Sequence, residues 1–488
     1  MKIAVIGSLI LSILHSILFY EKKPGISMFL FCIACLFFLF YLLEKKERLN
    51  NKKAILLSIP ILLLSSTYGL FNNETLRVLN GLVILGLTGY MIICLENKKV
   101  NLLNTFSKIF NIFIGALEYL GDSCSEIKKV FFIQSSDKKI GKGKKIVKAI
   151  FITVPIVLIV LALLISADSI FAEMFNGIIE KLQNIFTTEL ITSLFFRIVV
   201  LIIVFIYIVT ILYNLLQQKT SYAELQNKEH KVNKKIDSFT FHCIITVLNI
   251  IYLVFCLIQI TYLFNAKEMI NDFQYANYAR QGYFQLIIVS IINLILIVSS
   301  NSINNGNKSY TTIMKLALVL FTIIILISSF YRMYLYEQEY GLTFLRIVVF
   351  LAIITELMLM IPTVLYILNK NINLFSSYVM IITAMYIVLN FINIDSLIVK
   401  RNVELFYEKG EKTEDIDMYY LKHNISIDGI KEMQKLLISK NAEIREEVLT
   451  YLQSKQNMLQ ETKSIWEWNY NREAAKKNLE KLNLDEVI

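Results

Sequence analysis

The chain has 488 residues, of which 56% are hydrophobic and 18% are charged, and its mean hydropathy is +0.57. This composition is far more apolar than that of a soluble globular protein and excludes that class. The formal net charge of +10 does not indicate nucleic-acid binding, because the lysines cluster in short segments beside apolar runs, as topology determinants do. The sequence therefore predicts an all-α, polytopic membrane protein in a lipid bilayer, with no nucleic-acid partner.

Eleven apolar runs are long enough to cross a hydrocarbon layer of about 30 Å. Lysine and arginine concentrate in the even-numbered loops, which predicts a cytoplasmic amino terminus and an extracytoplasmic carboxyl-terminal tail. Glycine and proline are sparse, so the broken half-helices of many transporter sites are not visible. The runs are Ile3–Tyr20, Ile26–Leu43, Ala54–Leu70, Val78–Leu95, Ile146–Ile165, Leu190–Leu216, Phe239–Phe264, Tyr283–Ser300, Ile313–Tyr331, Phe344–Leu368 and Ser377–Ile394.

The segment between the fourth and fifth runs, Val100–Lys148, is amphipathic at first and basic afterwards. Its apolar residues recur at helical spacing but are interrupted by charges, which favours a helix lying in the membrane interface over a span. The basic stretch Lys138–Lys145 either binds anionic lipid or is a solvated linker whose lysines set the orientation. The chain is thus expected to comprise a four-span segment (1–95), this interfacial segment (96–148), a seven-span core (149–394) and a soluble helical tail (395–488).

An aromatic and polar segment, Asn271–Leu286, separates the seventh and eighth runs. Read as a helix, it places Arg280 on the same face as Phe273 and Phe284, where a carboxylate is the best partner for the guanidinium group. The predicted topology brings three further charged segments to the same side of the membrane. Either they form one outward Arg-aromatic binding surface, or they form a salt-bridge lattice that caps the bundle; its residues would be Arg280, Tyr278, Arg332, Arg346, Asp168, Glu337, Glu339 and Asp395.

Several motifs in the second half of the chain, Tyr278–Leu286, Tyr340–Thr343 and the spaced set Asn393, Asp395 and Asn402, together resemble a known family. It is an uncharacterised family of bacterial multi-pass membrane proteins with a domain of unknown function. The resemblance covers about 146–420 and leaves the first four predicted spans outside. It implies a shared architecture in a bacterial plasma membrane and adds no catalytic residue.

The sequence contains none of the common catalytic motifs. Paired-histidine zinc motifs, nucleophile elbows, P-loops and Gly-rich dinucleotide turns are absent, the six cysteines form no metal or disulfide pattern, and we expect no cofactor and no metal site. The best intramembrane candidate is Glu356, near the middle of Phe344–Leu368. Burial favours the neutral form of a carboxyl group, so Glu356 is either a proton carrier or a structural residue hydrogen-bonded to Asn249, Gln259 or Asn293.

The tail after Asp395 carries apolar residues at helical spacing near Ile430 and Ile444, and a capping box at Ser464–Glu467 predicts a third helix reaching about Leu482. The tail is a candidate surface for a protein partner. Three functions remain open. The residues favour an interaction or signalling component of the bacterial envelope; the alternatives are a proton-coupled transporter using Glu356 and a membrane enzyme acting on a lipid-linked substrate, although a non-enzymatic role is favoured.

Overall fold

The structure is a computed structural model, and it describes residues 1–46, 49, 51–96, 102–131, 189–217, 238–269, 283–299, 308–368, 372–461 and 464–482. Within these ranges all regular secondary structure is helical, which confirms the predicted fold class. Nine helices among the described residues are long and apolar enough to cross a membrane, and Phe284–Ser299 is a shorter apolar helix. The predicted span Ile146–Ile165 lies outside the described residues, so a total of eleven spans stays a prediction.

Two compact units divide the chain. The first contains Met1–Gly69, Asn80–Glu229 and Lys463–Trp468, and the second contains Leu70–Leu79, His230–Thr462 and Asn469–Ile488. Each unit therefore combines segments that are distant in the sequence. The short segment Lys463–Trp468 belongs to the amino-terminal unit, although the residues on either side of it belong to the other.

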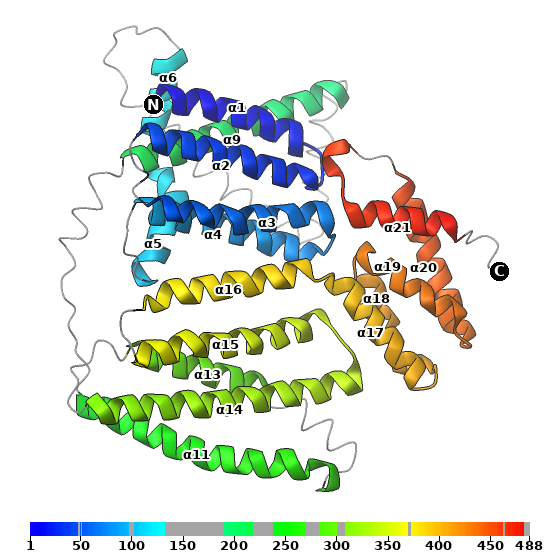
Figure 1. Ribbon diagram of the computed structural model, residues 1–488. Helices are drawn as coiled ribbons and strands as arrows, with labels where there is room; N and C mark the ends of the chain where they lie inside the picture. Colours follow the sequence, from blue (N-terminus) through cyan, green and yellow to red (C-terminus); the bar gives the residue numbers. More distant parts are fainter. Residues whose placement is uncertain are drawn as a thin grey trace, which may run out of the picture. The chain divides into compact units, whose positions relative to one another are not determined.

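The first unit consists of apolar helices and an amphipathic pair that runs across their ends (Figure 1). The pair, α5 and α6, packs on α9, where Ser123 Oγ and Thr210 Oγ1 are 2.8 Å apart and Asn214 Nδ2 donates to the Asn111 carbonyl at 2.8 Å. One amphipathic helix was predicted here, and two are found, separated by a short 3-10 turn. The elements are α1 (Lys2–Phe19), α2 (Ile26–Lys45), η1 (Lys52–Leu57), α3 (Ser58–Leu70), α4 (Glu74–Glu96), α5 (Leu102–Phe113), η2 (Gly115–Tyr119), α6 (Leu120–Phe131), α9 (Glu189–Gln217) and η7 (Ile465–Glu467). The end of α3 at Leu70 and the start of α4 up to Leu79 belong to the second unit.

In the second unit, a bundle of apolar helices is followed by a tail of shorter ones. The longest bundle helix, α14, is about 50 Å long at 1.5 Å per residue, which exceeds the hydrocarbon thickness, so its carboxyl-terminal turns extend past the apolar layer. The bundle elements are α11 (Ser238–Met269), α13 (Tyr283–Ser299), α14 (Lys308–Tyr340), α15 (Phe344–Leu368) and α16 (Leu374–Phe391). The tail elements are α17 (Ile394–Glu408), η4 (Thr413–Asp415), α18 (Met418–His423), η5 (Ile427–Gly429), α19 (Ile430–Met433), η6 (Gln434–Ile438), α20 (Ala442–Gln460) and α21 (Tyr470–Lys481).

The sharp turn between α14 and α15 is made by Gly341, whose φ of +70° lies in the left-handed region that favours glycine. A Cβ atom at this position would lie 2.0 Å from Asn402 Oδ1. The Asn402 side chain cannot easily move away, because its Nδ2 donates to the carbonyls of Leu342 and Ile398, both at 2.8 Å. The close contact between this turn and Asn402 of α17 therefore requires a residue without a side chain at position 341.

The tail has its own apolar core, and this core continues into the ends of the bundle helices. Phe406, Leu436, Val448 and Leu452 are fully buried in it together with Ile347 at the start of α15. Helices near Ile430 and Ile444 were predicted and are found as α19 and α20. The third helix begins later than expected, at Tyr470, because Asn469 and not Ser464 caps it.

Candidate functional site

Glu356 is a buried carboxyl group near the middle of α15, with 7% of its surface exposed. Its Oε2 accepts a hydrogen bond from the hydroxyl group of Ser290 on α13, and Ser290 is completely buried. The partners expected from the sequence were Asn249, Gln259 or Asn293, and this expectation was wrong. Ser290 lies one helical turn from Asn293 and presents its hydroxyl group to α15 instead.

Asn293 instead connects α13 to α11 and α14 through its side-chain amide. Its Oδ1 accepts from Tyr252 of α11 at 2.9 Å, and its Nδ2 donates to Thr322 of α14 at 3.0 Å. Both Asn293 and Thr322 are buried. Polar side chains inside a membrane bundle are costly unless they bond to one another, and here two adjacent turns of α13 supply both contacts.

Further polar pairs extend this arrangement toward both ends of the bundle. Near the start of α11, His242 Nε2 and Thr311 Oγ1 are 2.7 Å apart. Further along the same helix, Gln259 Oε1 accepts from Ser328 at 2.7 Å and from Arg332 at 3.1 Å. His242 and Gln259 are separated by about 25 Å along the helix axis. We refer to Glu356, Ser290, Asn293, Tyr252, Thr322, His242, Thr311, Gln259, Ser328 and Arg332 as the polar network.

The charged residues predicted for an outward surface are only partly placed by the structure. Arg280, Tyr278 and Asp168, as well as the basic stretch Lys138–Lys145, lie outside the described residues. Arg332 is half-buried and donates to Gln259 of α11 as part of the polar network.

Arg346 lies at the turn between α14 and α15. Its guanidinium group stacks over Tyr336, 4.3 Å from the ring centroid, and donates to the carbonyls of Tyr340 and Gly341. This arginine thereby covers the last turn of α14, where unpaired carbonyls favour a cation.

Glu337 bonds to an arginine that the sequence analysis did not single out. Arg401 Nε donates to Glu337 Oε1 at 2.6 Å, and the two side chains are 19% and 9% exposed. Glu339 pairs with Lys409 at 3.0 Å and is mostly exposed. Arg401 was missed because nothing in its local sequence distinguishes it from a solvent-facing residue of the tail.

Asp395 and Asp428 hold the turn between α3 and α4 against the tail. Asn72 donates to Asp428 through its backbone N–H at 2.6 Å and its side chain at 2.8 Å, while Asn73 Nδ2 donates to Asp395 Oδ1 at 2.8 Å. Asn72 Nδ2 also donates to Asn469 Oδ1 at 2.7 Å. We call these five residues the boundary clamp.

Burial is the largest cause of the shift in the pKa of Asp428. Removal from water raises the pKa of Asp428, the hydrogen bonds from Asn72 lower it, and the nearby Asp395 raises it further. Asp395 Oδ2 accepts the Ser426 N–H at 3.0 Å, so both of its oxygens are used. With their oxygens bonded to amides, these carboxylates act as structural acceptors.

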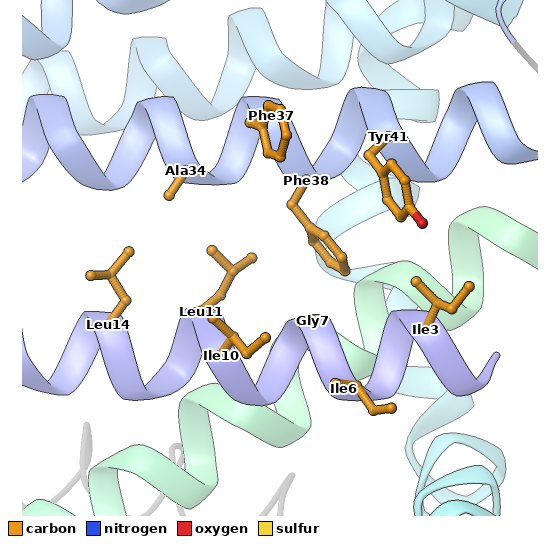
Figure 2. Close-up of a pocket in the computed structure, with 10 residues that line it drawn as sticks. All are labelled: Ile3, Ile6, Gly7, Ile10, Leu11, Leu14, Ala34, Phe37, Phe38 and Tyr41. Carbon is orange, nitrogen blue, oxygen red and sulfur yellow. The ribbon is translucent and has the colours of Figure 1, made fainter.

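The described part of the chain holds an apolar groove and no candidate metal site. No group of three or more His, Cys, Asp or Glu residues there could hold a metal ion. A groove of about 470 Å³ lies between α1 and α2, lined by apolar side chains and Tyr41, and Figure 2 shows Phe38 pointing toward Gly7. Its lining suits hydrocarbon better than a polar substrate.

A family model matches residues 58–436, and its description is a domain of unknown function (DUF4153). The match includes the fourth predicted span and most of the third, so it begins earlier in the chain than the sequence analysis expected. Neither the curated proteins nor the solved structures gave a match. Because the match spans well over half of the chain, this multi-pass membrane protein belongs to the family described as a domain of unknown function (DUF4153).

Proposed function

We propose that this protein is a proton-coupled transporter of a bacterial plasma membrane, with Glu356 as its proton-binding residue. The observation that carries the proposal is the buried Glu356 carboxyl group, whose partner among the described residues is the uncharged hydroxyl group of Ser290. A carboxylate left without water or a cation is unfavourable, so a proton is the simplest means of neutralising it. An ionisable residue within a spanning helix is a functional hypothesis by default.

A proton would reach Glu356 past the other groups of the polar network, with water bridging the gaps between its separate hydrogen-bonded sets. Hydroxyl, amide and imidazole groups can each donate one hydrogen bond while accepting another, and these group types recur from His242 to Gln259 along α11. The pairs lie on different helices, so small shifts between helices would change which groups are in contact. Coupling to a second solute would require that protonation of Glu356 changes its bond to Ser290.

The test is proton uptake by the full-length protein in proteoliposomes that contain a pH-sensitive dye, after an imposed pH gradient. Glu356→Gln keeps the shape of the side chain and removes its titration, so uptake is expected to fall to the level of empty vesicles. Glu339→Gln is the matched control, because Glu339 is 56% exposed and lies near the end of α14. Wild-type uptake by Glu356→Gln would exclude the proposal.

A second function, binding of a protein partner through the tail, is favoured by apolar side chains that the tail exposes. Tyr419 and Ile438 are 71% and 82% exposed. Contiguous exposed apolar surface marks interaction sites, and this second function requires that the two side chains belong to one such patch. Cross-linking of the full-length protein in its native membrane, compared with Tyr419→Ser and Ile438→Ser variants, tests this function: loss of a specific adduct supports it, and identical adduct patterns contradict it.

A further inference from the structure

The segment Ser464–Trp468 lies against the turn that joins α1 to α2. The N–H of Ile26 donates to the carbonyl of Trp468 at 3.1 Å, and the N–H of Lys23 donates to Glu467 Oε1 at 2.9 Å. These bonds involve the backbone of the turn, so they fix the position of the segment and not merely the direction of a side chain. Ser464 and Glu467 in turn close the segment on itself through the Ser464 N–H and Glu467 Oε2, 3.2 Å apart.

Gly25 makes this close approach possible. A Cβ atom on Gly25 would lie 2.6 Å from the Glu467 carbonyl carbon and 2.7 Å from the Trp468 oxygen. Both are backbone atoms, which cannot turn aside as the end of a flexible side chain can. The absence of a side chain at Gly25 is therefore what lets the segment reach the turn.

The depth of this turn follows from the helices it connects. Both α1 and α2 are candidate spans, and a turn of a few residues between two spans must lie at the membrane boundary. Tyr20, at the end of α1, lies under the guanidinium group of Arg197, 5.8 Å from the ring centroid. Tyrosine and arginine are the kinds of residue that anchor helices at this level.

The side chains of the segment suit the lipid interface. Ile465 is 83% exposed and Trp468 is 43% exposed, while Trp466 is half-buried. Indole rings favour the interface because they combine a large apolar surface with one hydrogen-bond donor. We infer that Ser464–Trp468 is a lipid-interface anchor, in which Ile465 and Trp468 contact the boundary between headgroups and acyl chains beside the turn between α1 and α2.

The two tryptophans of the chain both lie in this segment, so tryptophan emission reports on it alone. The full-length protein is reconstituted into phosphatidylcholine vesicles whose acyl chains carry bromine either near the headgroup or near the bilayer centre. A Trp466→Phe variant isolates the emission of Trp468. We expect bromine near the headgroup to quench this emission about twofold more strongly than bromine near the centre.

Three variants test the contact of this segment with lipid. Gly25→Ala should abolish the difference between the two bromolipids, whereas Gly86→Ala, where a Cβ atom would meet nothing within 4 Å, should preserve it. Ile465→Asp alters an exposed side chain and should weaken the quenching without unfolding the protein. Trp468 emission that is quenched by aqueous iodide and not by either bromolipid would overturn the inference, as would emission that neither agent quenches, since a protein partner would then cover the segment.

Discussion

Replacing Asp428 by alanine should release the turn between α3 and α4 from the tail. The change removes the acceptor of the Asn72 N–H at 2.6 Å and of one Asn72 Nδ2 hydrogen at 2.8 Å, whereas Asn469 still accepts the other. A hydrogen bond to a charged group contributes about 1.5–3 kcal/mol. The burial cost of Asp428 and its repulsion by Asp395 offset part of this sum, so we expect a loss of about 2–4 kcal/mol in the free energy of unfolding.

The assay is thermal unfolding of the detergent-solubilised protein, followed by tryptophan fluorescence, because Trp468 directly precedes Asn469 of the boundary clamp. Asp417→Ala is the matched control: Asp417 accepts only the Tyr420 N–H that caps α18, at 2.9 Å, and its loss should cost about 1 kcal/mol. If the two variants melt at the same temperature, the boundary clamp does not stabilise the tail and the reasoning fails.

The same site predicts an unusual pH dependence. The pKa of Asp428 is raised in the folded protein, so the folded state binds the proton more tightly than the unfolded chain, where the pKa is about 3.9. Stability must then fall as the pH rises from the unfolded pKa through the raised one. Relative to Asp428→Asn, the wild-type melting temperature should decrease over that range; an increase would contradict the direction of the shift.

Two further stability predictions can be checked with a thiol-reactive dye that reports exposure of the buried cysteines in detergent. Gly341→Ala should cost about 2–4 kcal/mol, because its Cβ would overlap the asparagine side chain of α17 described above, whereas Gly410→Ala has an open environment and should cost about 1–2 kcal/mol. Arg401→Ala leaves Glu337 buried without its cation and should cost about 2–4 kcal/mol; Lys409→Ala breaks an exposed pair and should cost under about 1 kcal/mol. Equal losses within either pair of variants would contradict the packing on which it depends.

Hydropathy predicted the bundle helices because each must be long and apolar enough to cross the hydrocarbon layer. The helix α15 has the predicted bounds, Phe344–Leu368, while α14 extends from Lys308 to Tyr340, well past the predicted run Ile313–Tyr331. The extra turns are polar or aromatic and leave the apolar layer, so hydropathy cannot detect them. Their end depends on the backbone conformation of Gly341.

In the candidate site, the sequence likewise identifies a residue that differs from its neighbours but not the distant residue that contacts it. Glu356 could be singled out because a carboxylate within an apolar run is conspicuous by itself. Its partner could not, since Ser290 also has an acceptor within its own helix, the Ile287 carbonyl, 2.7 Å from its hydroxyl oxygen. Asn72 and Asp428 are separated by 356 positions, and no periodicity links residues that far apart.

The hydrogen bonds of the tail also indicate which turns between helices face the same side of the membrane. Asn72, between α3 and α4, bonds to Asp428, and the carbonyl of Leu342, between α14 and α15, accepts from Asn402. Groups at hydrogen-bond distance outside the apolar layer cannot lie on opposite sides of a bilayer. The tail and both of these turns therefore face the same compartment.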